Sequence, residues 1–205
     1  MADVSDEIAV MAARLVVEDG MEYAAAKRKA ARELGRRAGR NGRGNALPSN
    51  EAVEDEVRDY IALFCADTQP GELRALREVA LLWMQRLQEF RPHLAGAVWR
   101  GTATRQSAVL LDLYCDDPKS AEISIINAGV DYDVASLDRP GAEPVNVLVV
   151  ASPSASLGEP VTVQLALHDF DELRGALKPD ARGRSWRGEL AAVQRLLEEG
   201  EGEDT

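Results

Sequence analysis

The sequence predicts an α+β protein in which a mixed, largely antiparallel sheet with flanking helices follows an N-terminal helical extension. Apolar residues recur at helical spacing as far as residue 90, whereas later segments are apolar throughout or alternate between apolar and polar residues. The links between those later segments are mostly of hairpin length, which favours antiparallel neighbours. With 205 residues, of which 45% are hydrophobic, the chain can form one core with an extension.

Charge and cysteine usage limit the kind of protein that the chain can be. A formal net charge of -11 at pH 7 argues against nucleic-acid binding over the whole surface. No apolar run approaches the roughly 20 residues that cross a membrane, and the acidic N-terminus differs from a secretory signal. Cys65 and Cys115 share no metal-ligand spacing and lie in apolar periods, so we expect buried free thiols in a reducing cytoplasm.

Two helices are expected at the start of the chain. Ser5 can cap the first, and Gly20 ends it. Alanines favour the second over residues 21–34, and Gly35 follows it. The apolar positions that define the first helix at helical spacing are Ile8, Met11, Ala12 and Leu15.

A basic segment overlaps the second helix and continues into a glycine-containing loop. From Lys27 to Arg43 the only acidic residue is Glu33. Such a segment can bind phosphate oxygens by charge-assisted hydrogen bonds, or it can be a solvated linker or a clasp on acidic surfaces of the same protein. No aromatic side chain interleaves the arginines, so stacking on bases has no platform. The candidate phosphate-binding residues are Lys27, Arg28, Arg36, Arg37, Arg40 and Arg43.

Two longer helices lead from this loop to the first strand. Residues 51–66 carry an apolar stripe of Val53, Val57, Ile61 and Phe64, and Thr68 can cap a helix over residues 70–90. A strand is then predicted at residues 94–100, a glycine turn at Gly101, and a second strand at residues 107–115.

The second strand carries one unusual residue. Alternation places Val109, Leu111, Leu113 and Cys115 on one face. The other face then holds Ala108, Leu110, Asp112 and Tyr114. Asp112 is the single carboxylate among these apolar side chains, and such exceptions in regular elements are where a functional site is sought first.

This strand pair resembles the signature of the nucleotidyltransferase superfamily, the polymerase-beta-like enzymes, over residues 68–133. Gly101-Thr102 stands where that signature has Gly-Ser, and residues 107–111 stand where it has Ser-Asp-apolar-Asp-Leu. The positions of the two catalytic aspartates are then Ala108 and Leu110. Nucleotidyl transfer uses two divalent cations about 3.5–4 Å apart, and these two side chains offer no oxygen ligand.

The resemblance therefore implies a nucleotidyltransferase-like core that has lost the two-metal chemistry and binds a nucleotide, a nucleic acid or a protein. A working transferase with displaced carboxylates is the first alternative. It would use Asp112, Asp116 and Asp133 as catalytic residues, with Mg²⁺ held by Asp112 and Asp133 and Asp131 as the second choice for Asp133. The residues implied to contact the nucleotide are Gly101, Thr102, Arg105 and Ser107.

Structural roles for the same carboxylates stay open. Asp112 can lie at a solvated strand end, and the aspartates of an edge strand can simply face water. Asp117 before Pro118 is a typical helix start, so we expect it to cap a helix over residues 118–128, although the alternating residues 122–126 also fit a strand.

The C-terminal third alternates between strands and short helices. Strands are predicted at residues 130–137, 145–151 and 161–167, with polar connectors between them. His168-Asp169 follows the last of these; it can be a base with its orienting carboxylate, although no nucleophile is adjacent. Further helices are predicted at residues 170–177 and 186–199, the latter capped by Ser185.

These predictions define a helical extension with a basic loop (1–66), a nucleotidyltransferase-like core (67–199) and an acidic disordered tail (200–205). A third functional hypothesis is a protein-interaction module without a ligand. The sequence lacks a Gly-Lys-Ser/Thr phosphate loop, a Gly-x-Ser-x-Gly element and clustered Cys or His, which argues against P-loop enzymes, serine hydrolases and zinc proteins.

Overall fold

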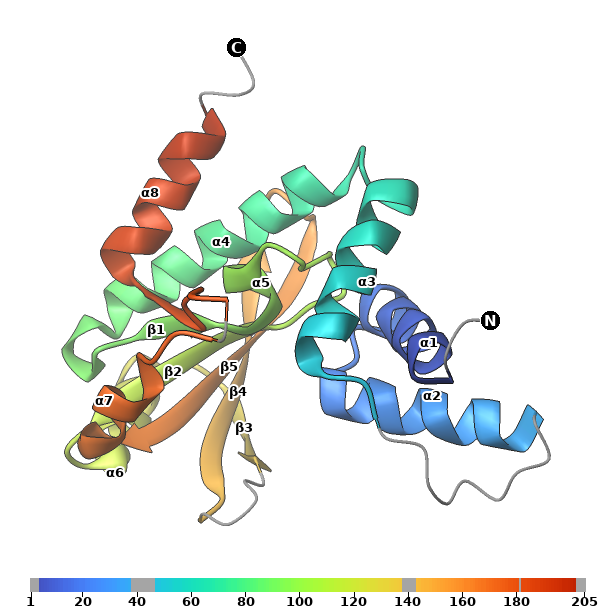
Figure 1. Ribbon diagram of the computed structural model, residues 1–205. Coiled ribbons are helices and arrows are strands. Elements are labelled where there is room, and N and C mark those ends of the chain that lie inside the picture. The colour runs from blue at the N-terminus through green and yellow to red at the C-terminus, as the bar shows by residue number, and fades with distance from the viewer. Residues whose placement is uncertain (1–3, 38–46, 138–142, 181, 202–205) are drawn as a thin grey trace. The chain divides into compact units, whose positions relative to one another are not determined.

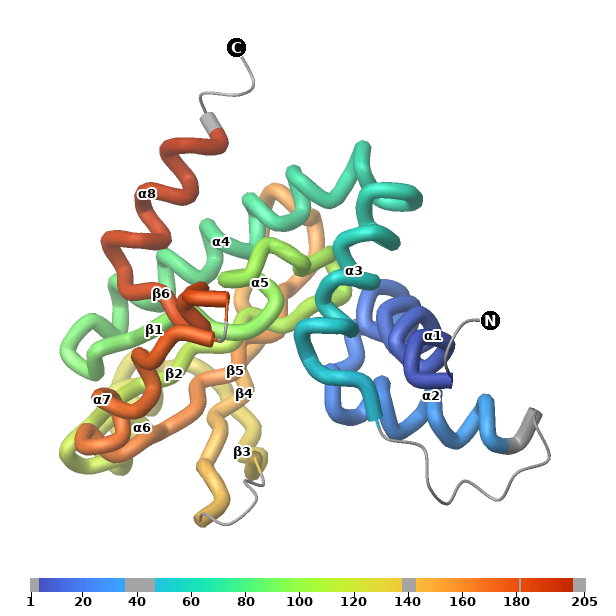
Figure 2. The backbone as a smooth tube through the Cα atoms, viewed as in Figure 1, coloured from blue at the N-terminus to red at the C-terminus, as the bar shows by residue number. Residues whose placement is uncertain are grey.

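The computed structural model describes residues 4–37, 47–137, 143–180 and 182–201. They form two compact units, which are traced in Figure 1 and Figure 2. Unit 1 is drawn from Met1–Pro70 and Thr102–Ser107, and unit 2 from Gly71–Gly101 and Ala108–Thr205. The division falls within the first turn of helix α4 (Gln69–Arg86), and the loop that follows Gly101 returns to unit 1.

Unit 1 is a helical unit in which one helix packs against two others. Helix α1 (Val4–Asp19) contacts both α2 (Tyr23–Arg37) and α3 (Asn50–Phe64). The side chains of Ile8, Ala12 and Val57 are fully buried in its core. Ser49 accepts a hydrogen bond from the amide of Ala52 at 3.0 Å, which caps α3 as helix-start residues commonly do.

The loop Thr102–Ser107 is built into unit 1 by hydrogen bonds to helix ends. The Thr104 hydroxyl donates to the carbonyl of Val17 at 3.2 Å, and the Gln69 amide donates to the carbonyl of Ala103 at 2.9 Å. A Cβ on Gly20 would lie 2.3 Å from the carbonyl oxygen of Gln106, and the φ of Gly20 is 65°. This position therefore requires glycine for both the close approach and the backbone conformation.

Unit 2 is organised around a six-stranded mixed sheet of order β3-β4-β5-β2-β1-β6 (Figure 1). Strand β2 pairs parallel with β5, and the other four pairings are antiparallel. One face of β2 is fully buried through Val109, Leu111 and Leu113. The strands are β1 (His93–Ala95), β2 (Val109–Cys115), β3 (Tyr132–Leu137), β4 (Val145–Ser154), β5 (Glu159–Asp169) and β6 (Arg187–Glu189).

The helices of unit 2 are shorter than those of unit 1, apart from α4. Asp117 accepts a hydrogen bond from the amide of Lys119 and caps α6, as predicted. Helix α5 ends at Gly101, whose φ of 78° is left-handed. Together with the 3-10 helices Gln88–Phe90 and Phe170–Glu172, the remaining helices are α5 (Gly96–Arg100), α6 (Pro118–Asn127), α7 (Leu173–Ala176) and α8 (Leu190–Glu201).

The α+β class and the mixed sheet are confirmed, and several local predictions are wrong. The predicted strand at 94–100 is the three-residue β1 followed by α5, because Gly96 has a φ of 67° and turns the chain into a helix. The two strands do pair, but a helix and a loop join them instead of a tight turn. The polar connector at 152–160 is largely strand, because β4 and β5 extend into a hairpin.

The helix predicted at 186–199 is also wrong at its start. Residues 187–189 form β6 and α8 begins at Leu190, so Ser185 does not cap the helix; its hydroxyl accepts a hydrogen bond from the amide of Arg187. Helix α8 also extends through Gly200 to Glu201 into the segment predicted to be disordered, and residues 202–205 lie outside the described part.

Two predictions made from the composition concern the cysteines and membrane-spanning segments. Both cysteines are free thiols, with Cys115 buried and Cys65 half-buried. Burial, followed by the charges of Asp116 and Asp117, raises the pKa of Cys115 to about 11, so this thiol is protonated near neutral pH. Within the described residues no helix combines the length and the apolar character needed to span a bilayer.

We predict that Gly188→Ala destabilises unit 2 by about 1–3 kcal/mol, because overpacking forces neighbours to move. A Cβ at this position would lie 2.0 Å from Cζ3 of Trp99. Gly175→Ala is the matched control, since among the described residues nothing beyond its chain neighbours and its own helix backbone lies within 4 Å of its Cβ position. Urea unfolding measures both free energies; equal stabilities of the two variants would contradict the packing of Trp99 on β6.

Candidate functional site

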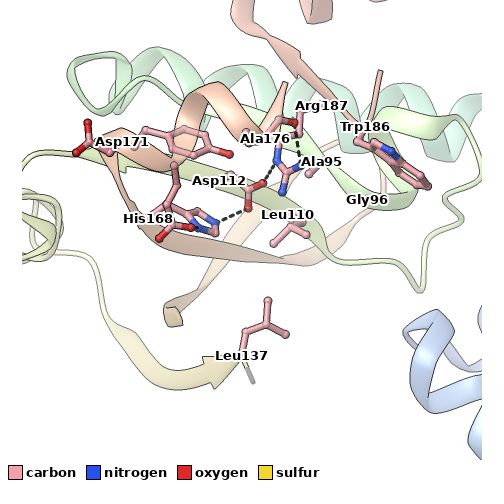
Figure 3. Close-up of a pocket in the computed structure, with 13 residues that line it drawn as sticks. Ala95, Gly96, Leu110, Asp112, Leu137, His168, Asp171, Ala176, Trp186 and Arg187 are labelled. Carbon is pink, nitrogen blue, oxygen red and sulfur yellow. Dashed lines mark hydrogen bonds and ion pairs between the residues drawn. The ribbon is translucent and has the colours of Figure 1, made fainter. Parts of the chain in front are cut away.

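A pocket of about 630 Å³ opens on the sheet face that carries the even-numbered side chains of β2. Leu110, Asp112 and Tyr114 line it from β2, His168 from β5 and Arg187 from β6, as Figure 3 illustrates for the labelled residues among them. The volume is within the range of small-molecule sites. Its polar groups gather around Asp112, whereas Ala95, Leu110 and Ala176 give the remainder of the wall an apolar character.

Asp112 is the centre of the polar cluster, and its two carboxylate oxygens have different partners. Oδ1 accepts from Nε2 of His168 at 3.1 Å, and Oδ2 accepts from Nε of Arg187 (Figure 3). Only 4% of the Asp112 side chain is exposed, against 26% for Arg187. A buried carboxylate needs a compensating cation, and Arg187 supplies it.

His168 lies between two carboxylates. Its Nε2 contacts Asp112, and its Nδ1 lies 3.5 Å from Oε2 of Glu172. Its ring stacks on Tyr114, with 5.2 Å between the centroids, and Tyr114 in turn meets His93 edge-on. Three rings on the neighbouring strands β1, β2 and β5 therefore form a row beside Asp112.

Arg187 is held in place by more than its ion pair. Its Nη1 donates to the carbonyl of Ala176 at 3.3 Å, which ties β6 to α7. Trp99 of α5 donates from Nε1 to the carbonyl of Ser185 at 2.9 Å. Arg100 forms a buried ion pair with Asp180 at 3.2 Å and lies over the ring of Trp186, 4.5 Å from its centroid. Helix α5 thus fixes the segment that delivers Arg187.

The electrostatics of the cluster keep Asp112 ionised. Burial by itself would raise the pKa of Asp112, but the hydrogen bond from His168 and the charge of Arg187 outweigh burial, so the pKa lies below its ordinary value. Burial and then the charge of Asp112 raise the pKa of Tyr114 to about 12. With its pKa raised, the buried Tyr114 hydroxyl is neutral near pH 7.

The structure does not bring the predicted carboxylates together. Asp133 lies on β3, and β4 and β5 separate β3 from β2, so about 14 Å of sheet lies between Asp133 and Asp112. Asp131 precedes the same strand, and Asp116 is exposed just beyond the end of β2. Within the described residues, no three His, Cys, Asp or Glu side chains converge as a metal site.

The residues predicted to contact a nucleotide are divided between the two units. Thr102, Arg105 and Ser107 belong to unit 1, whereas Gly101 and Asp112 belong to unit 2. The Ser107 hydroxyl accepts a hydrogen bond from the amide of Thr104 at 3.1 Å, which is a role within its own loop. Gly101 ends helix α5. These placements describe structural roles, and nucleotide contact remains a prediction.

The basic segment is described only in part. Lys27 donates to the carbonyl of Pro48 and to Oδ1 of Asn50, which joins α2 to the start of α3. The Arg28 carbonyl accepts from Nε of Arg32 within the helix. The side chains of Arg36 and Arg37, and Arg40 and Arg43 altogether, lie outside the described residues. Phosphate binding by this segment therefore stays a prediction.

Sequence reasoning identified Asp112 but missed its partners. The suggested orienting carboxylate of His168 was Asp169, yet Asp169 accepts from the amide of Asp171 and caps a 3-10 helix. Arg187 falls within the helix predicted at residues 186–199, and nothing in that helical pattern marks its side chain as a partner of Asp112. Glu172, the second carboxylate beside His168, comes from the 3-10 helix that follows β5, so helical i,i+4 spacing did not indicate it either.

Comparison of the chain with protein-family models, with curated proteins and with solved structures found no match in any of the three. The residues of the site are therefore the evidence for its chemistry. Asp112 is occupied by two partners, Tyr114 and Trp186 offer aromatic surface, and Asp171 and Glu172 line the pocket as further carboxylates. This arrangement is suited to binding a ligand by hydrogen bonds and apolar contact.

We predict that Asp112→Asn lowers the free energy of unfolding by about 2 kcal/mol at pH 7, because it leaves the part-buried Arg187 without its counter-charge. The wild-type advantage should decline below about pH 4. Since the folded pKa of Asp112 lies below its ordinary value of 3.8, its contribution is present above that value and is lost as the pH falls through the folded pKa.

Urea unfolding of both proteins between pH 7 and pH 2.5 measures this difference. Asp116→Asn is the control, because Asp116 is exposed and lies close by in the sequence. A pH-independent difference between wild type and Asp112→Asn would contradict the ion pair.

Proposed function

We propose that unit 2 is a nucleotidyltransferase-like core that binds a nucleotide in the β2 pocket without catalysing nucleotidyl transfer. The observation that carries this proposal is the engagement of Asp112 by both Arg187 and His168. A Mg²⁺ ion at Asp112 would have to compete with these hydrogen bonds and would be repelled by the adjacent guanidinium of Arg187, so this carboxylate is a poor metal ligand.

The neighbouring positions support the same reading. Leu110 precedes Asp112 by two residues on the same face of β2 and lines the pocket with hydrocarbon. Ala108 lies two residues earlier. Two-metal chemistry requires several carboxylate oxygens around a pair of cations, and neither position supplies one.

The charges in the pocket define which form of nucleotide it would accept. Three carboxylates line it, those of Asp112, Asp171 and Glu172, against the one guanidinium of Arg187. Free polyphosphate would be repelled by this surplus, so the phosphates would enter with Mg²⁺ bound to them. The apolar wall and the ring of Trp186 are suited to the base and sugar.

We predict that the protein binds a nucleoside triphosphate in the presence of Mg²⁺ and releases no pyrophosphate. Isothermal titration with each of the four triphosphates, with and without Mg²⁺, measures binding, and a coupled assay measures pyrophosphate. Leu110→Trp should weaken binding about tenfold or more by filling the pocket. Leu82→Trp is the control, since Leu82 is 40% exposed on α4 and does not line the pocket.

Two results would overturn the proposal. Pyrophosphate release abolished by Asp112→Ala would establish the displaced-carboxylate transferase instead. Failure of all four triphosphates to bind, with or without Mg²⁺, would exclude nucleotide binding at this pocket and leave the protein-interaction hypothesis.

We further predict that Ala108→Asp/Leu110→Asp creates a Mn²⁺ site that is at least about tenfold stronger than any in the wild type, because carboxylates are restored beside Asp112. The control is Leu82→Asp/Ile126→Asp, which adds two carboxylates at exposed positions. Mn²⁺ binding is followed by electron paramagnetic resonance. Equal binding by the two variants would show that positions 108 and 110 are not equivalent to metal-ligand positions.

A further inference from the structure

Unit 1 contains a second recess, which belongs to no role assigned so far. It measures about 580 Å³ and is lined along the outer side of α1, with contributions from α2 and α3. Helix α1 has 16 residues, which corresponds to a length of about 24 Å. The recess is therefore a groove along α1 to which α2 and α3 contribute.

The lining of this groove combines apolar and charged side chains. Val10 is 52% exposed, and Met11, Leu15 and Leu34 lie with it in the lining. Met11, Leu15 and Leu34 also pack against the core of unit 1, so Val10 is the apolar side chain of this lining that is most exposed. An exposed apolar side chain beside partly buried ones forms a patch that a partner can cover.

The apolar surface continues from the groove onto α3. Tyr60 lines the groove, and its ring packs against that of Phe64 with 4.6 Å between the centroids. Phe64 is 69% exposed. Aromatic residues with this exposure are enriched where proteins bind one another.

The rim of the groove is acidic. Glu18 accepts a hydrogen bond from the Tyr60 hydroxyl and forms an ion pair with Arg14. Because these two contacts lower the pKa of Glu18, its carboxylate is ionised near neutral pH. Among the described residues that line the groove, Arg14 is the one that is basic. The acidic residues in the lining are Asp6, Glu7, Glu18 and Glu33.

From this combination we infer that the groove binds a basic amphipathic helix of a partner protein. Its apolar side would lie on Val10, Met11 and Leu34, and its Lys and Arg side chains would reach the carboxylates of the rim. Such a helix would complete a four-helix arrangement with α1, α2 and α3. The inference is independent of the nucleotide pocket, since all residues of the groove belong to unit 1.

The charge of the groove selects this occupant over two others. A second copy of the chain presenting the same face would bring the same carboxylates against one another. An anionic membrane surface would be repelled by the rim. A basic amphipathic helix is the occupant that both the apolar side chains and the carboxylates of the groove favour.

The test uses the full chain and two labelled peptides of about 18 residues, each with leucine at helical spacing on one face. One peptide carries Lys and Arg on the other face, and its partner carries Glu. Fluorescence anisotropy should detect the basic peptide alone, with an affinity that falls about tenfold between 50 mM and 300 mM salt.

Variants then locate the site. Val10→Lys and Glu7→Lys should each weaken binding of the basic peptide by about tenfold. Ile126→Lys and Glu89→Lys are matched controls, because they make the same changes at exposed positions of unit 2. Controls that weaken binding as much as the groove variants would place the peptide elsewhere and overturn the inference.

Three other outcomes would also overturn the inference. They are equal binding of both peptides, binding of neither, and a concentration-dependent dimer in sedimentation that Val10→Lys abolishes. The last would identify a second copy as the occupant.

Discussion

The need to neutralise one buried carboxylate governs the arrangement of unit 2. Asp112 is nearly inaccessible to water, and an isolated charge in that environment would cost several kcal/mol. Its compensation comes from His168 and Arg187, which are 56 and 75 residues away in the sequence. This compensation requires β5 and β6 to flank the β1–β2 pair. It also requires the side chains of His168 and Arg187 to lie on the same face of the sheet.

The same compensation defines what the pocket can do. The guanidinium of Arg187 that compensates Asp112 would also repel a metal ion at this carboxylate, so stability and two-metal catalysis make opposite demands on Asp112. Around it lies a recess with an apolar wall, aromatic rings and further carboxylates from the segment that follows β5. Such a recess is consistent with the ligand binding proposed for unit 2.

Local sequence pattern determined much of the fold. The apolar period identified α3 and the cap at Asp117 identified α6, because a 3.6-residue period and a cap are properties of neighbouring residues. The apolar run of β4 and the alternation of β5 identified two adjacent strands for the same reason. The α+β class and the importance of Asp112 followed from these patterns alone.

Tertiary structure decided what those patterns could not. Strand β6 has three residues, too few to show a period, and only its pairing with β1 makes it a strand. The parallel register of β2 on β5 places His168 beside Tyr114, and no local signal encodes a register between segments so far apart. The sequence thus supplied the buried charge, whereas its partners depended on pairing between distant strands, because periodicity describes neighbours and electrostatic compensation acts through space.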